Sequence, residues 1–277
     1  MRGLPLHSGA RGLEDDCAVL EFGGETLVLN HDVMAEGTHF RSDADMADVA
    51  WKLVASNLSD LAAKGAEPIG VLLGHCLDTD NAGFARGLSE ALKAFDVTLL
   101  GGDTIKAKGP RVFGLTAIGR ATHSPVPSRG GARAGDAVYV TGPLGRAMLG
   151  FEGHEEHLEA FNRPWPRLAY GRALAPFVSA MMDISDGLLL DAYRMAKASL
   201  DTAIELESSL IPVADVTRLD ECIRWGEDYE LLFTAPADVV LPVHADRIGT
   251  VTSLDIAPLW LDGELLSDPK GLGYQHS

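Results

Sequence analysis

Aspartates recur in this chain at points where an apolar stretch ends or a helix is expected to begin. They lie in five short stretches: Asp15-Asp16, Asp32, Ser59-Asp60, Gly101-Gly102-Asp103 and Asp183-Ile184-Ser185-Asp186-Gly187. Carboxylate oxygens are the ligands that Mg²⁺ prefers, and a glycine, having no side chain, lets the backbone approach a phosphate closely. A helix N-terminus, expected just after Ser185, also favours a bound phosphate. Together these stretches predict a site where metal ions hold phosphate groups.

Each stretch also has an ordinary structural interpretation. Gly101-Gly102-Asp103 follows the apolar strand expected over 97–100 and is typical of a turn. Asp60 lies among Leu and Ala on an expected helix, where the edge of the core suits it as well as a metal does. Ser185 is a good N-cap and Asp186 complements the positive end of the next helix, but neither role explains Asp183. The prediction of a site therefore depends on the stretches together.

The composition is that of an acidic globular protein. The chain has 277 residues, 46% of them hydrophobic and 23% charged, so it is long enough to bury a full core. Its 23 Lys and Arg against 40 Asp and Glu leave a net charge of −17. Nucleic acid binding demands clustered Lys and Arg, so we expect no nucleic acid partner. An acidic balance fits an enzyme whose carboxylates bind divalent ions.

The cysteines and the apolar runs bear on the expected location. Cys17, Cys76 and Cys222 are far apart and form no C-x-x-C pair, so neither disulfides nor structural zinc are expected. A reducing cytoplasm suits three free thiols. We see no signal peptide at the N-terminus and no apolar run long enough to span a bilayer, so no membrane association is expected.

The hydrophobic periodicity predicts strands that alternate with helices, the pattern of an α/β or α+β fold. In the first half we expect a hairpin around Gly23-Gly24, a helix from Asp45 to Lys64, and further elements over 69–77, 82–95, 97–100 and 112–118. In the second half we expect strands over 137–140, 180–182, 203–206 and 231–233, helices from 144 to 176, and a helix ending near Ala198.

A domain boundary is expected where Pro, Ser and Gly crowd together after Thr122. We predict an N-terminal domain over 1–121, a linker over 122–134 and a C-terminal domain over 135–277. Arg129 in this linker is either plain linker charge or an arginine that holds phosphate.

Six motifs occur in order along nearly the whole chain, and together they resemble thiamine-monophosphate kinase of the aminoimidazole ribonucleotide synthetase-like superfamily. They are Asp15-Asp16-Cys17-Ala18-Val19-Leu20, His31-Asp32 with Glu36-Gly37-Thr38-His39-Phe40, Asn57-Leu58-Ser59-Asp60-Leu61-Ala62-Ala63, Gly101-Gly102-Asp103-Thr104, Asp183-Ile184-Ser185-Asp186-Gly187 and Gly226-Glu227-Asp228-Tyr229-Glu230. Each motif is modest by itself, but the ordered set is specific.

The resemblance implies a fold, an activity and a set of site residues. The fold would be two α/β domains with mixed sheets flanked by helices, in a homodimer built through the N-terminal halves. The activity would be in-line transfer of the ATP γ-phosphate to the phosphate of thiamine monophosphate. Several Mg²⁺ would be held by Asp16, Asn30, His31, Asp32, Asp60, Asp103, Asp183 and Asp186. ATP would contact Gly102, Asp103, Arg129 and Ser185, and the substrate would contact His39, Glu227 and Tyr274. Because the attacking phosphate is already deprotonated at neutral pH, no general base is expected.

The chain departs from the family pattern in four places. Asn30-His31 stands where Ser-Thr is usual, Glu14 stands for Gly, and Trp225 stands for the first Gly of the Gly-Gly-Glu-Asp segment. Pro269 stands where an aromatic residue is expected to cover the thiamine ring, which leaves Tyr274 as a substitute. A neutral imidazole is a poor Mg²⁺ ligand, so we expect the main-chain carbonyl of His31, and not its ring, to reach the metal.

Two other functions stay open at this point. One is another ATP-dependent synthetase of the same superfamily, such as selenophosphate synthetase, although the first 13 residues contain no reactive cysteine. The other is a non-catalytic protein that binds nucleotide or metal.

Overall fold

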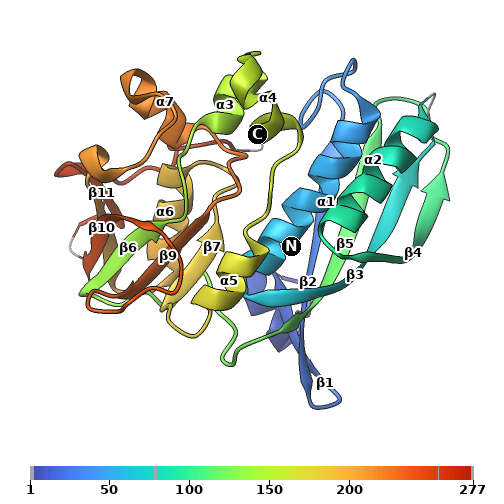
Figure 1. Ribbon diagram of the computed structural model, residues 1–277. Coiled ribbons are helices and arrows are strands. Elements are labelled where there is room, and N and C mark those ends of the chain that lie inside the picture. Colours follow the sequence, from blue (N-terminus) through green and yellow to red (C-terminus); the bar gives the residue numbers. More distant parts are fainter. Residues whose placement is uncertain (1–2, 78–79, 255, 276–277) are drawn as a thin grey trace.

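The computed structural model describes residues 3–77, 80–254 and 256–275, and it shows two β-sheets flanked by helices (Figure 1). The expected α/β fold with mixed sheets is therefore confirmed. Strands β1–β5 all end by residue 121, and strands β6–β12 all begin after residue 135. The division into domains at 121 and 135 remains a prediction about folding units. In the part of the chain that the structure describes, no helix has both the length and the apolar character needed to cross a membrane.

The first sheet has five strands in the order β1-β2-β5-β3-β4. Their bounds are β1 Ala18–Phe22, β2 Glu25–Ala35, β3 Ala66–Cys76, β4 Thr98–Ile105 and β5 Val112–Ala121. β3 and β4 pair in parallel, and the other neighbours are antiparallel. The expected hairpin is confirmed, since β1 and β2 pair with Phe22 opposite Glu25 and Gly23 and Gly24 at positive φ between them.

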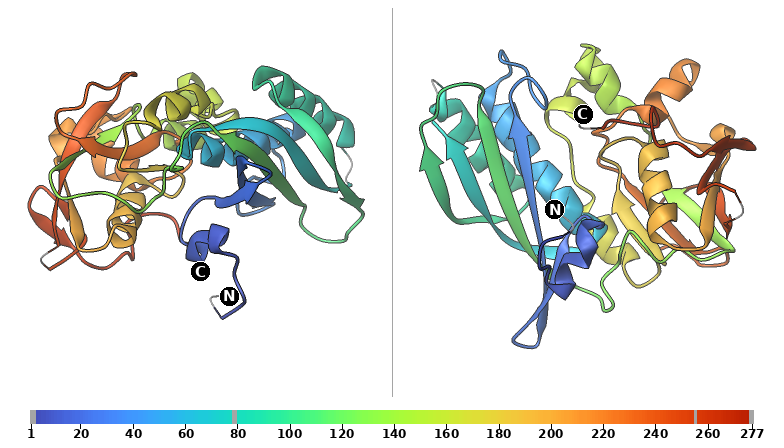
Figure 2. Two further views of the ribbon diagram at one scale, coloured as in Figure 1. Left: turned by 90° about the horizontal axis from the view of Figure 1, so that it is seen from below. Right: turned by 180° about the vertical axis from the view of Figure 1, so that it is seen from behind.

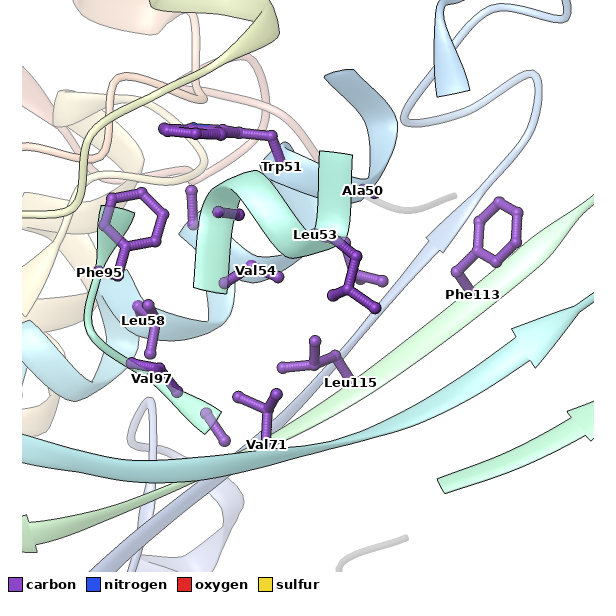
Figure 3. Close-up of a cluster of buried hydrophobic side chains, with 14 of the residues drawn as sticks. Ala50, Trp51, Leu53, Val54, Leu58, Val71, Phe95, Val97, Phe113 and Leu115 are labelled. Atoms are coloured by element: carbon purple, nitrogen blue, oxygen red, sulfur yellow. The ribbon is translucent and has the colours of Figure 1, made fainter. Parts of the chain in front are cut away.

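Helices α1 (Met46–Ala63) and α2 (Asn81–Ala94) pack on one side of this sheet (Figures 1 and 2). Asp45 caps α1 by accepting a hydrogen bond from the Ala47 N–H at 2.8 Å. Leu53, Val54 and Leu58 of α1 lie in the core that the sheet and α2 enclose (Figure 3). The last turn of α1 packs instead against the second sheet, so α1 is buried on nearly every side and joins the two halves.

The second sheet has seven strands in the order β12-β11-β8-β10-β6-β9-β7. Their bounds are β6 Asp136–Val140, β7 Ala180–Asp183, β8 Thr202–Leu206, β9 Leu231–Pro236, β10 Asp246–Ser253, β11 Leu259–Leu261 and β12 Glu264–Leu266. β11 pairs with β8 in parallel, and the other pairs are antiparallel. Because side chains alternate along each strand, the sheet has two apolar faces, and both are covered.

Short helices complete the second half. They are α3 Arg146–Phe151, α4 Leu158–Asn162, α5 Leu168–Leu174, α6 Leu188–Ala198 and α7 Leu219–Arg224, with 3-10 turns η1 Ser8–Leu13, η2 Glu155–His157, η3 Ser208–Leu210 and η4 Val216–Arg218. α6 packs its leucines on one face of the second sheet. α5 and the end of α1 cover the other face around Tyr139 and Phe233.

One expectation about the first sheet is wrong. The strand expected over 97–100 continues to Ile105, so Gly101-Gly102-Asp103 lies inside β4 and is not a turn after it. The reason is close pairing with β3, whose register shifts between Val71 and Leu72. A Cβ on Gly102 would come within 2.0 Å of the Leu73 carbonyl oxygen, so glycine is required there by the strand pairing itself.

Candidate active site

A cavity of about 770 Å³ lies between the two halves and collects most of the predicted site residues. The predicted residues in its lining are Asp16, Asp32, His39, Asp60, Arg129, Asp183, Ser185, Asp186, Glu227 and Tyr274. They come from both halves of the chain, so the cavity exists only when the halves pack together.

Three carboxylates converge at one end of this cavity. Asp16 precedes β1, Asp60 lies on α1 and Asp183 ends β7, yet each offers an oxygen within 4.8 Å of the others. Ser59 fixes one of them by donating a hydrogen bond to Asp183 Oδ2 at 2.6 Å. If all three were ionised, carboxylates at this spacing would repel one another, which favours either protonation or a bound cation.

The ionisation of these acids reflects that crowding. Burial, reinforced by the charge of Asp16, raises the pKa of Asp183 to about 8. Burial and the neighbouring carboxylates Asp32 and Asp183 raise the pKa of Asp60 well above its ordinary value. Burial also raises the pKa of Asp32. Asp183 therefore holds a proton at neutral pH unless a cation replaces it.

The donor atoms fit a hard divalent cation such as Mg²⁺. Beside Asp60, the side-chain Nδ2 of Asn30 donates to Asp60 Oδ2 at 2.7 Å and to Asn57 Oδ1 at 3.1 Å. The side-chain Oδ1 of Asn30 is buried and finds no hydrogen-bond partner among the described residues. A buried, unsatisfied oxygen next to a carboxylate cluster is the environment that an oxygen-seeking ion relieves.

Two basic residues border the cluster. Lys64, four residues after Asp60 and at the C-cap of α1, is fully buried, and its Nζ lies 2.7 Å from Asp16 Oδ2 and 2.5 Å from Asp15 Oδ1. Burial opposes ionisation of Asp15, but Lys64 and Arg11 nevertheless hold its pKa well below the usual range. Arg129 is paired with Asp16, and its buried Nε has no hydrogen-bond partner within the described chain. That N–H can donate to an anionic ligand such as phosphate.

The turn before α6 differs from its sequence-based prediction. α6 begins at Leu188 with Gly187 at the N-cap, so Ser185 is not the N-cap residue. Gly187 has φ 108°, and a Cβ there would lie 2.5 Å from the Arg224 carbonyl oxygen. The fully buried Asp191 accepts hydrogen bonds from the Ser185 and Asp186 N–H groups at 3.2 and 3.0 Å. Asp191 of α6 therefore holds this turn through hydrogen bonds from the turn's main-chain N–H groups.

The predicted substrate contacts lie elsewhere in the lining. Nδ1 of His39 accepts a hydrogen bond from the Ala35 N–H at 3.1 Å. Glu227, at φ 65°, is bound by the buried Lys52 at 3.0 Å. Tyr274 is 45% exposed, and its N–H donates to the Asp186 carbonyl at 2.9 Å. Side-chain contacts thus hold His39 and Glu227 at the cavity, and a main-chain hydrogen bond holds Tyr274 there.

Four predicted residues are not in the lining of this cavity. Asn30 is buried beside Asp60, as described above. His31 is exposed, with Nδ1 2.9 Å from Thr116 Oγ1. Gly102 and Asp103 lie on the edge strand β4.

The sheet register separates Asp103 from Asp32. Asp103 lies in one row with Gly74, Gly114 and Val33, one position along from the row of Asp32. Residues directly opposite one another share a face, and the next row points to the other face. Two strands, β5 and β3, also lie between β2 and β4, a distance of about 14 Å. Within one chain, Asp103 therefore faces away from the acid cluster.

Several residues of the site were not predicted from the sequence. Lys64 had a visible signal, since it lies four residues after Asp60 and shares its helix face. Lys52, Asp191 and Arg194 had none, because their partners are brought to them by tertiary packing. Arg194 contacts both Asp186 and Asp191.

The raised pKa values predict how the stability of the metal-free protein depends on pH. Asp183 has a pKa of about 8 in the folded state against 3.8 ordinarily, so between these values the folded state binds more protons than the unfolded state. The free energy of unfolding must then fall as pH rises from about 4 to about 8. Denaturation with a chelator at pH 5 to 8 should show this fall. Mg²⁺ should offset it, because the ion binds the deprotonated acids.

A control variant isolates the cause. Asp183→Asn removes one titrating group and should make the pH dependence measured in chelator shallower, while Asp191 and Asp228, whose pKa values burial raises to about 7, still contribute. Asp15 does not interfere, because its pKa is lowered and its contribution changes only below about pH 4. A metal-free protein that became more stable between pH 5 and 8 would contradict this electrostatic description.

This chain resembles a known protein family and several named relatives. Residues 14–121 match the family model "AIR synthase related protein, N-terminal domain". The chain is 36% identical to thiamine-monophosphate kinase of Escherichia coli strain K12, over 94% of this chain and 86% of the relative. It is 38% identical to thiamine-monophosphate kinase of Methanopyrus kandleri, over 86% of this chain and 82% of the relative.

Solved structures agree with this comparison. The structure of AaThiL complexed with AMPPCP and TMP superposes with a TM-score of 0.83 at 28% identity, covering 96% of this chain and 97% of that one. Thiamine-monophosphate kinase from Stenotrophomonas maltophilia K279a gives a TM-score of 0.78 at 31% identity, over 93% and 95%. Hydrogenase maturation protein HypE in complex with ATP shares the fold, with a TM-score of 0.71 at 19% identity over 94% and 91%.

Proposed function

The chain belongs to the thiamine-monophosphate kinase family, and from this we propose that it transfers the γ-phosphoryl group of ATP to the phosphate of thiamine monophosphate. The products are thiamine diphosphate and ADP. The observation that carries the proposal is the convergence of Asp16, Asp60 and Asp183 beside Arg129 in a cavity of about 770 Å³. Such a cavity is large enough for two phosphorylated ligands.

The chemistry requires neutralisation more than bond-making by side chains. Both reacting groups are anionic phosphates, and phosphoryl transfer depends on in-line positioning and on neutralising charge. Mg²⁺, when bound, would supply positive charge between the two phosphates. Asp16, Asp32, Asp60 and Asp183 would hold these ions, with Asp186 at the neighbouring turn and the Asn30 oxygen beside Asp60.

The other lining residues bind and orient the two substrates. Arg129 has an unused N–H for an ATP phosphate, and Ser185 lies in the turn that Asp191 holds. His39, Glu227 and Tyr274 bind the acceptor at the remaining walls. No residue acts as a general base, because the attacking phosphate oxygen carries no proton that must be removed first.

The experiment is an incubation with ATP, Mg²⁺ and thiamine monophosphate, followed by separation of the thiamine esters. Thiamine diphosphate and ADP should appear in equal amounts. ADP without thiamine diphosphate would point instead to another ATP-dependent synthetase of the superfamily. No consumption of ATP would point to a non-catalytic relative.

We also propose that the active form is a homodimer that pairs through the first sheet. α1 and α2 cover one side of this sheet, and the row pattern puts Val33, Leu72 and Val112 on the other. Their side chains are 45%, 39% and 47% exposed, an apolar surface that a second copy of the chain would cover. Asp103 shares this surface, so a second copy would bring its Gly102 and Asp103 to the interface.

A mixing experiment tests both parts of this proposal. Light scattering at micromolar concentration should give the mass of a dimer. If Asp103 of one copy serves the cavity of the other, Asp103→Asn and Asp60→Asn should each be inactive alone. After exchange of subunits, the mixture should regain activity, because each mixed dimer has one intact site. A monomer, or a mixture that stays inactive, would contradict the composite site.

A further inference from the structure

The wall of the cavity formed by Phe151, Phe161 and Trp225 has no role in the chemistry described above. All three residues line the cavity, and they come from three short elements: the end of α3, α4 and the residue after α7. The ring centroids of Phe151 and Trp225 are 5.1 Å apart, and those of Phe151 and Phe161 are 5.4 Å apart. We call these three residues the aromatic wall.

The aromatic wall is not explained by packing of the core. Phe151 is 43% exposed, and neither Phe151 nor Phe161 belongs to a buried cluster of the described residues. Trp225 is partly buried against Met148, Leu149 and Cys222, so one side of its ring is supported. Contact between large apolar rings and water costs free energy, and a ligand that covers the rings removes this cost.

The wall is also held in place from the first half of the chain. The buried Lys52 of α1 places Nζ 3.6 Å from the centroid of the Phe161 ring, a cation–π contact, and pairs with Glu227 at 3.0 Å. Lys52 thereby links an aromatic ring to the carboxylate that borders the cavity. Because Lys52 already occupies one face of Phe161 and pairs with Glu227, the rings left to stack on a flat ligand are mainly those of Phe151 and Trp225.

We propose that the aromatic wall is the subsite on which the flat heteroaromatic part of the acceptor stacks, and that Trp225 determines selectivity for it. The inference rests on the proposed function, in which the acceptor is thiamine monophosphate, a molecule with a pyrimidine and a cationic thiazolium ring. The phosphate lies at the acid cluster, and the rings stack on the wall. Binding at the wall positions the acceptor and does not touch the reacting atoms.

The test compares the affinity for thiamine monophosphate, measured by calorimetry, with the kinetic constants. Trp225→Leu should weaken binding about tenfold, which is about 1.4 kcal/mol, while kcat and the KM for ATP stay within about twofold. Phe151→Leu should act in the same direction, and it serves as the second variant because Phe151 is the more exposed ring. Trp225→Phe should restore most of the affinity.

Trp165→Leu is the matched control. Trp165 is 57% exposed and its ring contacts Trp51 and the edge-on ring of Phe95, outside the cavity lining, so its loss should leave the affinity for thiamine monophosphate unchanged. Equal affinity in wild type, Trp225→Leu and Phe151→Leu would overturn the proposal even if the kinase is active. Affinity that depends on the wall, without formation of thiamine diphosphate, would support the wall and refute the proposed function. Absence of binding by the wild type would refute both.

Discussion

Asp60→Asn is expected to lower kcat by about a thousandfold, a loss of about 4 kcal/mol of transition-state stabilisation. Asp60 is one of the three acids of the cluster: it accepts a hydrogen bond from Asn30 Nδ2 and lies within 4.8 Å of oxygens of Asp16 and Asp183. The variant keeps the shape of the side chain and removes its charge, so it tests metal binding and not packing. Calorimetry with Mg²⁺ alone should show a weaker or absent site.

Stability distinguishes this role from a structural one. The raised pKa of Asp60 means that its ionised form is costly in the folded, metal-free protein. In chelator at pH 8, Asp60→Asn should therefore be as stable as the wild type or more stable. Loss of a carboxylate that stabilises the fold would instead lower the stability. Asp43→Asn, at a side chain that is 72% exposed, is the control and should change neither activity nor Mg²⁺ binding. Full activity of Asp60→Asn at saturating Mg²⁺ would remove Asp60 from the site.

Asp32→Asn is expected to lower kcat by about a hundredfold or more, while His31→Thr should keep activity within about tenfold. The two residues are neighbours on β2, but successive side chains of a strand point to opposite faces. Asp32 lines the cavity and is half-buried, whereas His31 lies on the exposed face of the sheet beside Thr116. The imidazole therefore does not reach the lining, and any metal contact at His31 falls to its carbonyl oxygen.

The comparison also tests which ion the site takes. With Mg²⁺ as the ion, activity of His31→Thr should depend on Mg²⁺ in the same way as that of the wild type. If His31→Thr is inactive, or if Zn²⁺ supports turnover where Mg²⁺ does not, the side chain binds the metal and the ligand set must be revised.

The elements of the fold could largely be predicted because they follow local rules. The alternation of apolar residues predicted the strands on either side of Gly23-Gly24, and the helix of residues 45–64 was recognisable from its spacing and from the stop at Gly65. The strand after Val97 was predicted too short, because glycines usually end strands and only the close approach of β3 explains why β4 continues through them.

The acids of the site could be predicted, but their surroundings could not. Asp16, Asp60 and Asp183 each occupy a conspicuous place in the sequence, and the fold brings them within 4.8 Å. The contacts of Lys52 with Glu227 and of Asp191 with the turn at Ser185 arise only when distant segments pack. Asp103 is the opposite case. Its motif predicted a place in the site, but the sheet register puts its side chain on the other face of the sheet.

The most direct test of the account follows the phosphate itself. The protein is incubated with Mg²⁺ and ATP labelled in the γ-phosphate, with either thiamine monophosphate or free thiamine as acceptor. We predict that the label enters the terminal phosphate of thiamine diphosphate, and that free thiamine, which lacks the attacking phosphate oxygen, receives essentially none. Equal labelling of free thiamine, or release of all the label as inorganic phosphate, would contradict the proposed transfer of the γ-phosphoryl group to the phosphate of thiamine monophosphate.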